Sequence, residues 1–221
     1  MFLFNSLIYR LMVIKKLFIF LVALAFLCTV NSSIAQHHVL PTVETQRVWK
    51  GRPIDNPLYD LSIRKWNGIY NPEIPWYWAK AQLLAESGLD PSAVSPVGAK
   101  GLGQFMPLTW KDMQRELGFS GSEYTPVLSI QAHAYYMNKL RANFKAPRPE
   151  YDKHSLALAS YNAGLGNVLK AQKKAGGSIY YDPMIQSLPL VTGEKNSRET
   201  TLYVQRIWRY TDYYKSIYEG E

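Results

Sequence analysis

The chain has 221 residues, of which 47% are apolar, a composition that suits a folded protein with a core and excludes a disordered chain. The formal charge is +8, but the basic residues form no block of the kind that follows nucleic acid. A mild positive balance suits an anionic partner, and it equally serves solubility.

Residues 1–35 have the layout of a secretory signal peptide. Three basic residues precede an apolar run of 14 residues, Leu17 to Val30, and Ser33-Ile34-Ala35 offers a cleavage site. The run is shorter than the roughly 20 residues that cross a bilayer, although a retained anchor is the alternative. Cys28, the only cysteine, lies in this run, so the exported chain has no thiol for disulfides or metal binding. Removing the three basic residues from the charge of +8 leaves +5.

Residues 36 to about 74 are predicted to be irregular, because prolines interrupt them. These are Pro41, Pro53, Pro57, Pro72 and Pro75. Interspersed tyrosines and tryptophans indicate that this segment packs on the rest of the protein. We therefore expect an N-terminal arm at 36–71 and one domain at 72–221.

From Pro75 onward the pattern is helical. The first helix begins at Pro75 and ends before Gly88, a residue that favours helix ends. Further helices are predicted over 107–117, 126–144, 154–162, 166–174 and 197–218. The stretch 176–197 is interpreted as a long loop, and a small hairpin fits residues 97–106. The fold class is therefore all-α, or α+β at most.

Glu86 is the first candidate for chemistry. It falls in the last turn of the helix that begins at Pro75, where the carbonyl ends make the local potential negative. Its neighbours on that face, Ala79 and Leu83, are apolar. Both effects disfavour the carboxylate and raise the pKa of the carboxyl group, as a general acid requires. Position alone fits a solvated glutamate at a helix end better.

A glycine-rich segment follows Glu86. Ser95 to Pro107 reads Ser-Pro-Val-Gly-Ala-Lys-Gly-Leu-Gly-Gln-Phe-Met-Pro, and its glycines let a backbone approach a bound group closely. A phosphate-binding loop would need a preceding strand and a following Gly-Lys-Ser/Thr, and the sequence has neither.

The segment from Glu86 to Pro107 resembles the soluble lytic transglycosylase family, which has the lysozyme fold. That family carries a catalytic Glu-Ser and then S-P-x-G-A-x-G-L-M-Q-x-M-P, which this sequence follows without a gap. Ala159-Ser160-Tyr161-Asn162-Ala163-Gly164 is similar to the family's A-Y-N-A-G motif, and Glu199 to Val204 is similar to its E-T-x-x-Y-V motif. The resemblance covers residues 72 to 216. Gly103 departs from it, since the family usually has Met there, and we expect the missing side chain to widen a subsite or to alter the sugar preference.

The resemblance implies roles for the residues of the first motif. Glu86 would be the catalytic acid and base. Ser95 and Gln104 would bind the acetamido group of the sugar or its neighbours, and Met106 would line the floor of the groove.

The two later motifs would complete the site. By the resemblance, Tyr161 and Asn162 face Glu86 across the cleft, Tyr203 helps to position it, and Glu199 is a supporting carboxylate. Taken singly, the tyrosines fit core packing and Asn162 fits a helix end.

The function that the resemblance implies is non-hydrolytic cleavage of the MurNAc–GlcNAc bond of peptidoglycan. Most glycosidases use two carboxyl groups, and no second one stands out here. In the family the 6-hydroxyl of N-acetylmuramic acid attacks its own anomeric carbon, which leaves a 1,6-anhydro end. No metal or cofactor is expected, and the site of action would be the periplasm or cell envelope. The alternatives are a goose-type lysozyme-like hydrolase and a wall-binding or assembly protein that has lost activity.

Overall fold

A computed structural model describes residues 48–49, 52–53 and 56–220. The predicted signal peptide, together with residues 36–47, 50–51 and 54–55 of the predicted arm, lies outside the described residues. Across the residues that are described, no helix is long and apolar enough to cross a membrane.

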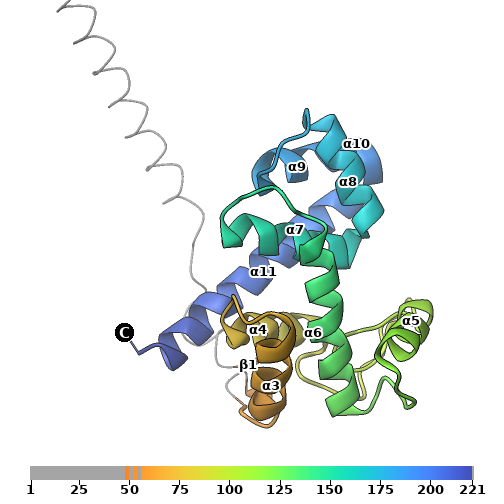
Figure 1. The fold of residues 1–221 in the computed structure, drawn as a ribbon, viewed down its shortest axis with the longest axis vertical. Coiled ribbons are helices and arrows are strands. Elements are labelled where there is room, and N and C mark those ends of the chain that lie inside the picture. Colours follow the sequence, from red (N-terminus) through yellow and green to blue (C-terminus); the bar gives the residue numbers. More distant parts are fainter. Residues whose placement is uncertain (1–47, 50–51, 54–55, 221) are drawn as a thin grey trace, which may run out of the picture. The chain divides into compact units, whose positions relative to one another are not determined.

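The described part of the chain is helical, apart from one short pair of strands (Figure 1). In chain order its elements are β1 (Val48–Trp49), β2 (Arg52–Pro53), α3 (Asp60–Tyr70), α4 (Trp76–Ser87), α5 (Pro107–Leu117), α6 (Pro126–Ala142), α7 (Glu150–Ala163), α8 (Leu165–Lys174), α9 (Tyr181–Ser187), α10 (Pro189–Thr192) and α11 (Glu194–Tyr218). β1 and β2 pair in antiparallel register, with Val48 opposite Pro53. The all-α prediction is confirmed.

Helix α4 lies at the centre of the packing. It contacts α3 and the long C-terminal helix α11, and α11 also packs on α7 (Figure 1). The largest apolar cluster joins residues of α4, α6, α7 and α11, among them Leu84, Met137, Leu158 and Ile207. Burial of this apolar surface holds α4 and α11 together, although their sequences are more than 100 residues apart.

The helix ends predicted at Gly88 and Gly118 agree with the structure, whereas α7 begins at Glu150 and α11 at Glu194, four and three residues earlier than predicted. Gly88 and Gly118 follow α4 and α5 with φ values of 69° and 67°, which a residue without Cβ adopts at little cost. The hairpin predicted over 97–106 is present as two isolated antiparallel bridges, in which Lys100 pairs with both Val94 and Phe105.

Two segments predicted to be irregular are helical instead. Within 36–74, the prolines at 57 and 72 flank α3 rather than interrupt it, and α3 buries Ile63 and Asn67 on one face. Within 176–197, Pro183 falls in the first turn of α9 and Pro189 is the first residue of α10, where the missing N–H breaks no helical hydrogen bond. The loop prediction was therefore wrong for both.

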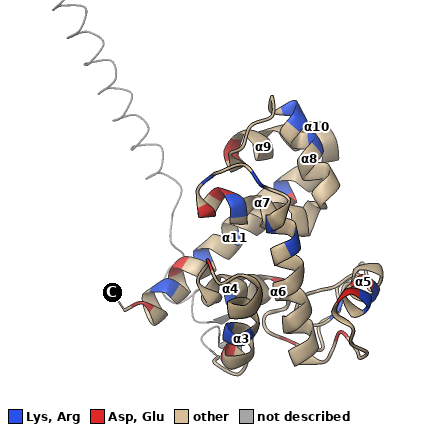
Figure 2. Ribbon diagram, viewed as in Figure 1, with Lys and Arg blue, Asp and Glu red and all other residues tan. Residues whose placement is uncertain are grey.

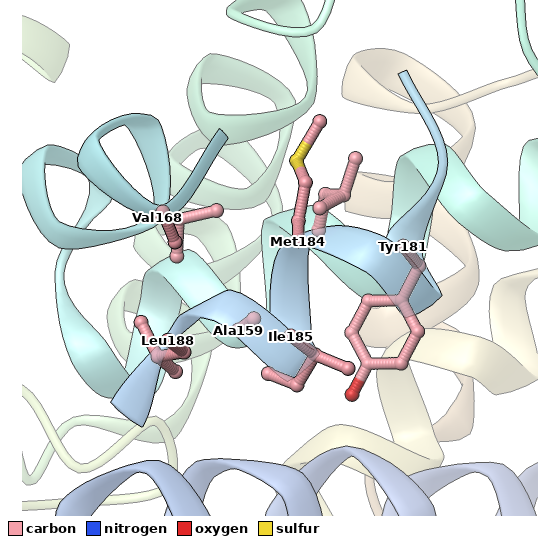
Figure 3. Close-up of a pocket in the computed structure, with 8 residues that line it drawn as sticks. Ala159, Val168, Tyr181, Met184, Ile185 and Leu188 are labelled. Atoms are coloured by element: carbon pink, nitrogen blue, oxygen red, sulfur yellow. The ribbon is translucent and has the colours of Figure 1, made fainter. Parts of the chain in front are cut away.

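Helix α9 docks on an apolar seam formed with α7 and α8. Figure 3 shows Tyr181, Met184 and Ile185 of α9 beside Ala159 of α7 and Val168 of α8. Met184 is 1% exposed and Leu188 is also 1% exposed. The seam has no room for a water molecule, so it belongs to the core and is not a ligand pocket.

Charged residues of both signs are spread over the described helices. Figure 2 shows Lys and Arg interspersed with Asp and Glu. The lysines and arginines form no single block in the sequence, and in the ribbon they are likewise spread over several helices.

Candidate active site

Glu86 lies one residue before the end of α4, on a helix that is buried around most of its circumference. Gly88 ends the helix, and its N–H donates to the carbonyl of Leu84. Ala79 and Leu83, the apolar neighbours expected from the sequence, are 6% and 0% exposed. The carboxyl group is thus held on a rigid element at the edge of the core and is itself half-buried.

Tyr203 of α11 binds the carboxyl group of Glu86. Its hydroxyl donates to Oε1 of Glu86 at 2.5 Å, and Nε2 of Gln82 donates to the oxygen of the same hydroxyl at 3.1 Å. Tyr203 and Gln82 are 3% and 0% exposed. The contact between α4 and α11 therefore builds a line of hydrogen bonds that ends on Glu86.

Burial raises the pKa of Glu86 to about 7, because a carboxylate loses solvation there. The hydrogen bond from Tyr203 and the positive charge of Arg206 act in the opposite direction and lower this pKa, but the effect of burial is larger. A carboxyl group with this pKa is protonated in a large fraction of molecules near neutral pH. It can therefore donate a proton and later accept one.

Tyr161 of α7 lies close enough to Glu86 for their charges to interact. Burial, and then the charge of Glu86, raise the pKa of Tyr161 well above its ordinary value, so its hydroxyl stays protonated. That hydroxyl donates to the carbonyl of Gly103 at 2.5 Å, which ties α7 to the glycine-rich loop. The N–H of Gly103 in turn donates to Oγ of Ser129.

Gly103 does not open the groove as expected. The residue is buried, and a Cβ placed there would lie 2.7 Å from the ring of Phe105 and 3.3 Å from the hydroxyl of Tyr161. The volume that a side chain would occupy is already filled by the Phe105 ring. The departure from the family pattern therefore belongs to local packing and does not widen a subsite.

Ser95 and Gln104 support the loop between α4 and α5. Oγ of Ser95 accepts the N–H of Ala99 at 2.9 Å, and Nε2 of Gln104 donates to the carbonyls of Ala93 and Gly101. Both side chains are half-buried. Gln104 also has a φ of +48°, in the left-handed region, so its loop hydrogen bonds hold a strained backbone. Met106 ends this loop and is 44% exposed.

Asn162 and Glu199 lie together at a second place, a polar pocket of about 210 Å³. Both residues are exposed. Oγ1 of Thr200 donates to Oδ1 of Asn162 at 2.7 Å, which links the end of α7 to the start of α11. The other lining residues are Ala163, Asn167, Thr192 and Asn196. Glu86 does not line this pocket.

The transglycosylase SLT domain model matches residues 65–182, more than half of the chain. The chain belongs to this family. Among its relatives are the membrane-bound lytic murein transglycosylases F of Alcanivorax borkumensis and Shewanella halifaxensis. Each is 32% identical, over 62% and 73% of this chain. The matches cover 31% and 35% of those proteins, so the chain spans about a third of their length.

Solved structures of lytic transglycosylases share the fold. The 70-kDa soluble lytic transglycosylase of Escherichia coli matches with a TM-score of 0.58 and 26% identity, over 75% of this chain and 25% of that one. An inactive glutamate-to-glutamine mutant of the lytic transglycosylase Slt of Pseudomonas aeruginosa matches equally well, over 74% of this chain and 25% of its own. A complex of the 70-kDa enzyme with bulgecin A has a TM-score of 0.60, 26% identity and the same 75% and 25% coverage.

The SLT fold brings only some of the predicted site residues together. Tyr203 of α11 is hydrogen-bonded to Glu86 of α4, and Tyr161 of α7 lies within electrostatic range of Glu86. Ser95 and Gln104 hold the loop, while Asn162 and Glu199 line the polar pocket. Within the described ranges, no group of three His, Cys, Asp or Glu residues is placed to hold a metal ion.

Sequence reasoning missed two residues of the Glu86 cluster. Gln82 lies four residues before Glu86, on the same face of α4, and this spacing could have indicated it. Arg206 lies three residues after Tyr203 on α11, and its charge acts on Glu86. Nothing in the sequence distinguishes Arg206 from the other arginines of α11 as a neighbour of Glu86.

Proposed function

We propose that this SLT-family chain is a peptidoglycan lytic transglycosylase in which Glu86 is the acid and the base. The observation that carries the proposal is the half-buried carboxyl group, whose pKa burial raises to about 7 and which Tyr203 holds in place. A group with these properties protonates a leaving oxygen near neutral pH. The relatives' names, lytic murein transglycosylase, support the same chemistry for this chain.

The proposed reaction uses one carboxyl group for both steps. Glu86 first protonates the glycosidic oxygen, so that the bond to the anomeric carbon breaks and the oxygen leaves as a hydroxyl. The carboxylate then takes the proton of the 6-hydroxyl of N-acetylmuramic acid, whose oxygen bonds to the same carbon. The product is a 1,6-anhydro sugar, no water is consumed, and Glu86 ends protonated. A nucleophile within the sugar gains from its high effective concentration.

The surroundings of Glu86 fit this sequence. The groups that act on its pKa are Tyr203 and Arg206, neither of which is a carboxylate that could serve as nucleophile or base. Arg206 stabilises the negative form that follows proton donation. Tyr203 donates a hydrogen bond to Oε1, and we assign the other carboxyl oxygen to the substrate.

Substrate contacts are proposed at three places around Glu86. Ser95, Gln104 and Met106 border the loop that follows α4, and we assign the acetamido group of the sugar to this side. Tyr161 would contact the sugar next to the broken bond. Asn162 and Glu199 line the polar pocket, where amide and carboxylate groups suit a hydroxyl-rich or amide-rich part of the strand.

The place of action would be the bacterial cell envelope, after export through the segment at 1–35. The partner would be the peptidoglycan strand itself, and the mild positive charge suits its anionic groups.

The test is product analysis on purified peptidoglycan. We expect fragments that end in 1,6-anhydro-N-acetylmuramic acid, and mass spectrometry separates these from hydrolysed fragments, which are heavier by one water. Hydrolysed products with free reducing ends would show a lysozyme-like hydrolase instead.

Glu86→Gln keeps the shape of the side chain and removes the titrating group. We expect it to reduce the rate of fragment release by a factor of about 10² or more. Activity that survives this change would contradict the assignment of Glu86. A wild-type protein that binds the wall without releasing fragments would indicate a binding or assembly protein.

A further inference from the structure

Gln82 is a buried polar side chain that the mechanism has not yet used. It is 0% exposed, lies one turn before Glu86 on α4, and donates from Nε2 to the hydroxyl oxygen of Tyr203 at 3.1 Å. In the described part of the chain, its own Oε1 is buried and has no hydrogen-bond partner. Such an oxygen costs stability, so burial by itself gives no reason for an amide rather than an apolar side chain at this position.

The geometry limits how Tyr203 can place its single hydroxyl proton. The hydroxyl can donate one hydrogen bond, either to Glu86 or to a neighbour that accepts. Because Gln82 turns its N–H and not its Oε1 toward the hydroxyl, it offers no acceptor there, and the hydroxyl proton points to Oε1 of Glu86 at 2.5 Å. The same N–H occupies a lone pair of the hydroxyl oxygen. This disfavours a hydrogen bond from a protonated Glu86 back to Tyr203.

We propose that Gln82 is a positioning residue that acts through Tyr203: it fixes the direction of the Tyr203 hydroxyl and keeps the proton of Glu86 available to the substrate. The inference rests on the proposed function, because it assigns a role in the acid and base steps of Glu86. Gln82 itself is fully buried and does not touch the substrate.

The charged and titratable groups around Glu86 come from two other helices. Tyr203 and Arg206 act from α11, and Tyr161 acts from α7. Of these, Tyr203 is the one hydrogen-bonded to Gln82. A change at Gln82 should therefore reach Glu86 by way of Tyr203, whose hydrogen bond to the carboxylate weakens when its own oxygen loses a donor.

The first test is Gln82→Met, which keeps the length of the side chain and removes the amide. We expect the pKa of Glu86, followed by carbon NMR of its carboxyl group, to rise by about half a unit. On peptidoglycan, kcat should fall on the order of tenfold with KM unchanged, since the geometry of the acid is disturbed and the groove is not. The control is Thr211→Val on α11, which also removes a buried polar atom without a hydrogen-bond partner among the described residues. It should leave the pKa of Glu86 and kcat unchanged.

The second test is a double-mutant cycle with Tyr203→Phe. If Gln82 acts through the Tyr203 hydroxyl, Gln82→Met should have no further effect on the Glu86 pKa when that hydroxyl is absent. Equal effects in both backgrounds would overturn the proposal, as would an unchanged pKa in the single variant.

A measurement on the unmodified protein covers the case in which Gln82→Met fails to fold. The side-chain amide resonances of Gln82 should titrate with the same midpoint as Glu86, because Tyr203 links the two groups. Amide resonances that stay constant through this pH range would overturn the proposal. The NMR experiments need no substrate, so they remain decisive even if product analysis were to reject transglycosylase activity.

Discussion

At the scale of the residue, the raised pKa of Glu86 has a consequence for stability. Below pH 4.5, the ordinary value, both the folded and unfolded chains hold the proton. Between pH 4.5 and about 7 the unfolded chain releases it while the folded chain keeps it, so stability falls as pH rises through this window. Glu86→Gln removes this titration. Relative to wild type, we expect the variant to gain about 2–3 kcal/mol in free energy of unfolding between pH 4 and pH 8, measured by urea denaturation.

Glu116→Gln is the matched control, with the opposite sign. The hydrogen bond from Lys139 lowers the pKa of Glu116, so its contribution to stability is present above the ordinary pKa and is lost in acid. This variant should be slightly less stable than wild type at pH 8, and the difference should shrink toward pH 4. If the Glu86→Gln gain were constant across pH, the pKa of Glu86 would be the same in the folded and unfolded chains, and the raised pKa would be contradicted.

At the scale of the element, the sequence predicts helices well where a helix-ending glycine and the spacing of apolar residues indicate the same boundary. Gly88 and Gly118 mark helix ends correctly, and the sequence motifs predict Tyr203 and Tyr161, but not Gln82 or Arg206, as neighbours of Glu86. At α3, α9 and α10 the prolines led to a wrong prediction of irregular chain. A proline in the sequence can interrupt a helix or lie at its start, and the residue alone does not distinguish the two. Gln82 and the polar pocket could not be predicted, since both depend on how α11 packs on distant helices.

Helix α3 is anchored by a buried ion pair that sequence patterns do not reveal. Nζ of Lys80 on α4 is fully buried, 2.7 Å from Oδ1 of Asp60 on α3 and 2.7 Å from the hydroxyl of Tyr218 on α11. Lys80→Met would remove the cation that pairs with the buried Asp60. We expect a loss of about 3–5 kcal/mol in urea denaturation, because an uncompensated buried charge is costly.

Two further variants test this account of the ion pair. Adding Asp60→Asn to Lys80→Met should restore much of the lost stability, since the unpaired charge is then gone. Lys139→Met, which breaks the more exposed pair with Glu116, should cost no more than about 1 kcal/mol. A similar loss for both lysine variants would show that burial of the pair does not matter.

At the scale of the whole molecule, the described helices differ in how deeply they are built into the core. Helix α4 buries most of its residues, whereas α5 buries Trp110 and Met113, in a separate cluster with Phe105 and Ala132. The main packing partner of α5 is α6, and Figure 1 shows α5 at the side of the helical bundle. We infer that α5 can open while α4 and α11 stay packed. Under the proposed function, this opening would let the loop before α5 adjust to a glycan strand.

Amide hydrogen exchange tests this inference. In the wild-type protein, amides of α5 should exchange faster than those of α4 and α11. Ile207→Val weakens the main core on α11 by about 1 kcal/mol, which should accelerate exchange in α4 and α11 about fivefold. Exchange in α5 should not change, because its opening leaves the Ile207 contacts intact. Equal acceleration in all three helices would instead mean that α4, α5 and α11 open as one cooperative unit, without local opening of α5.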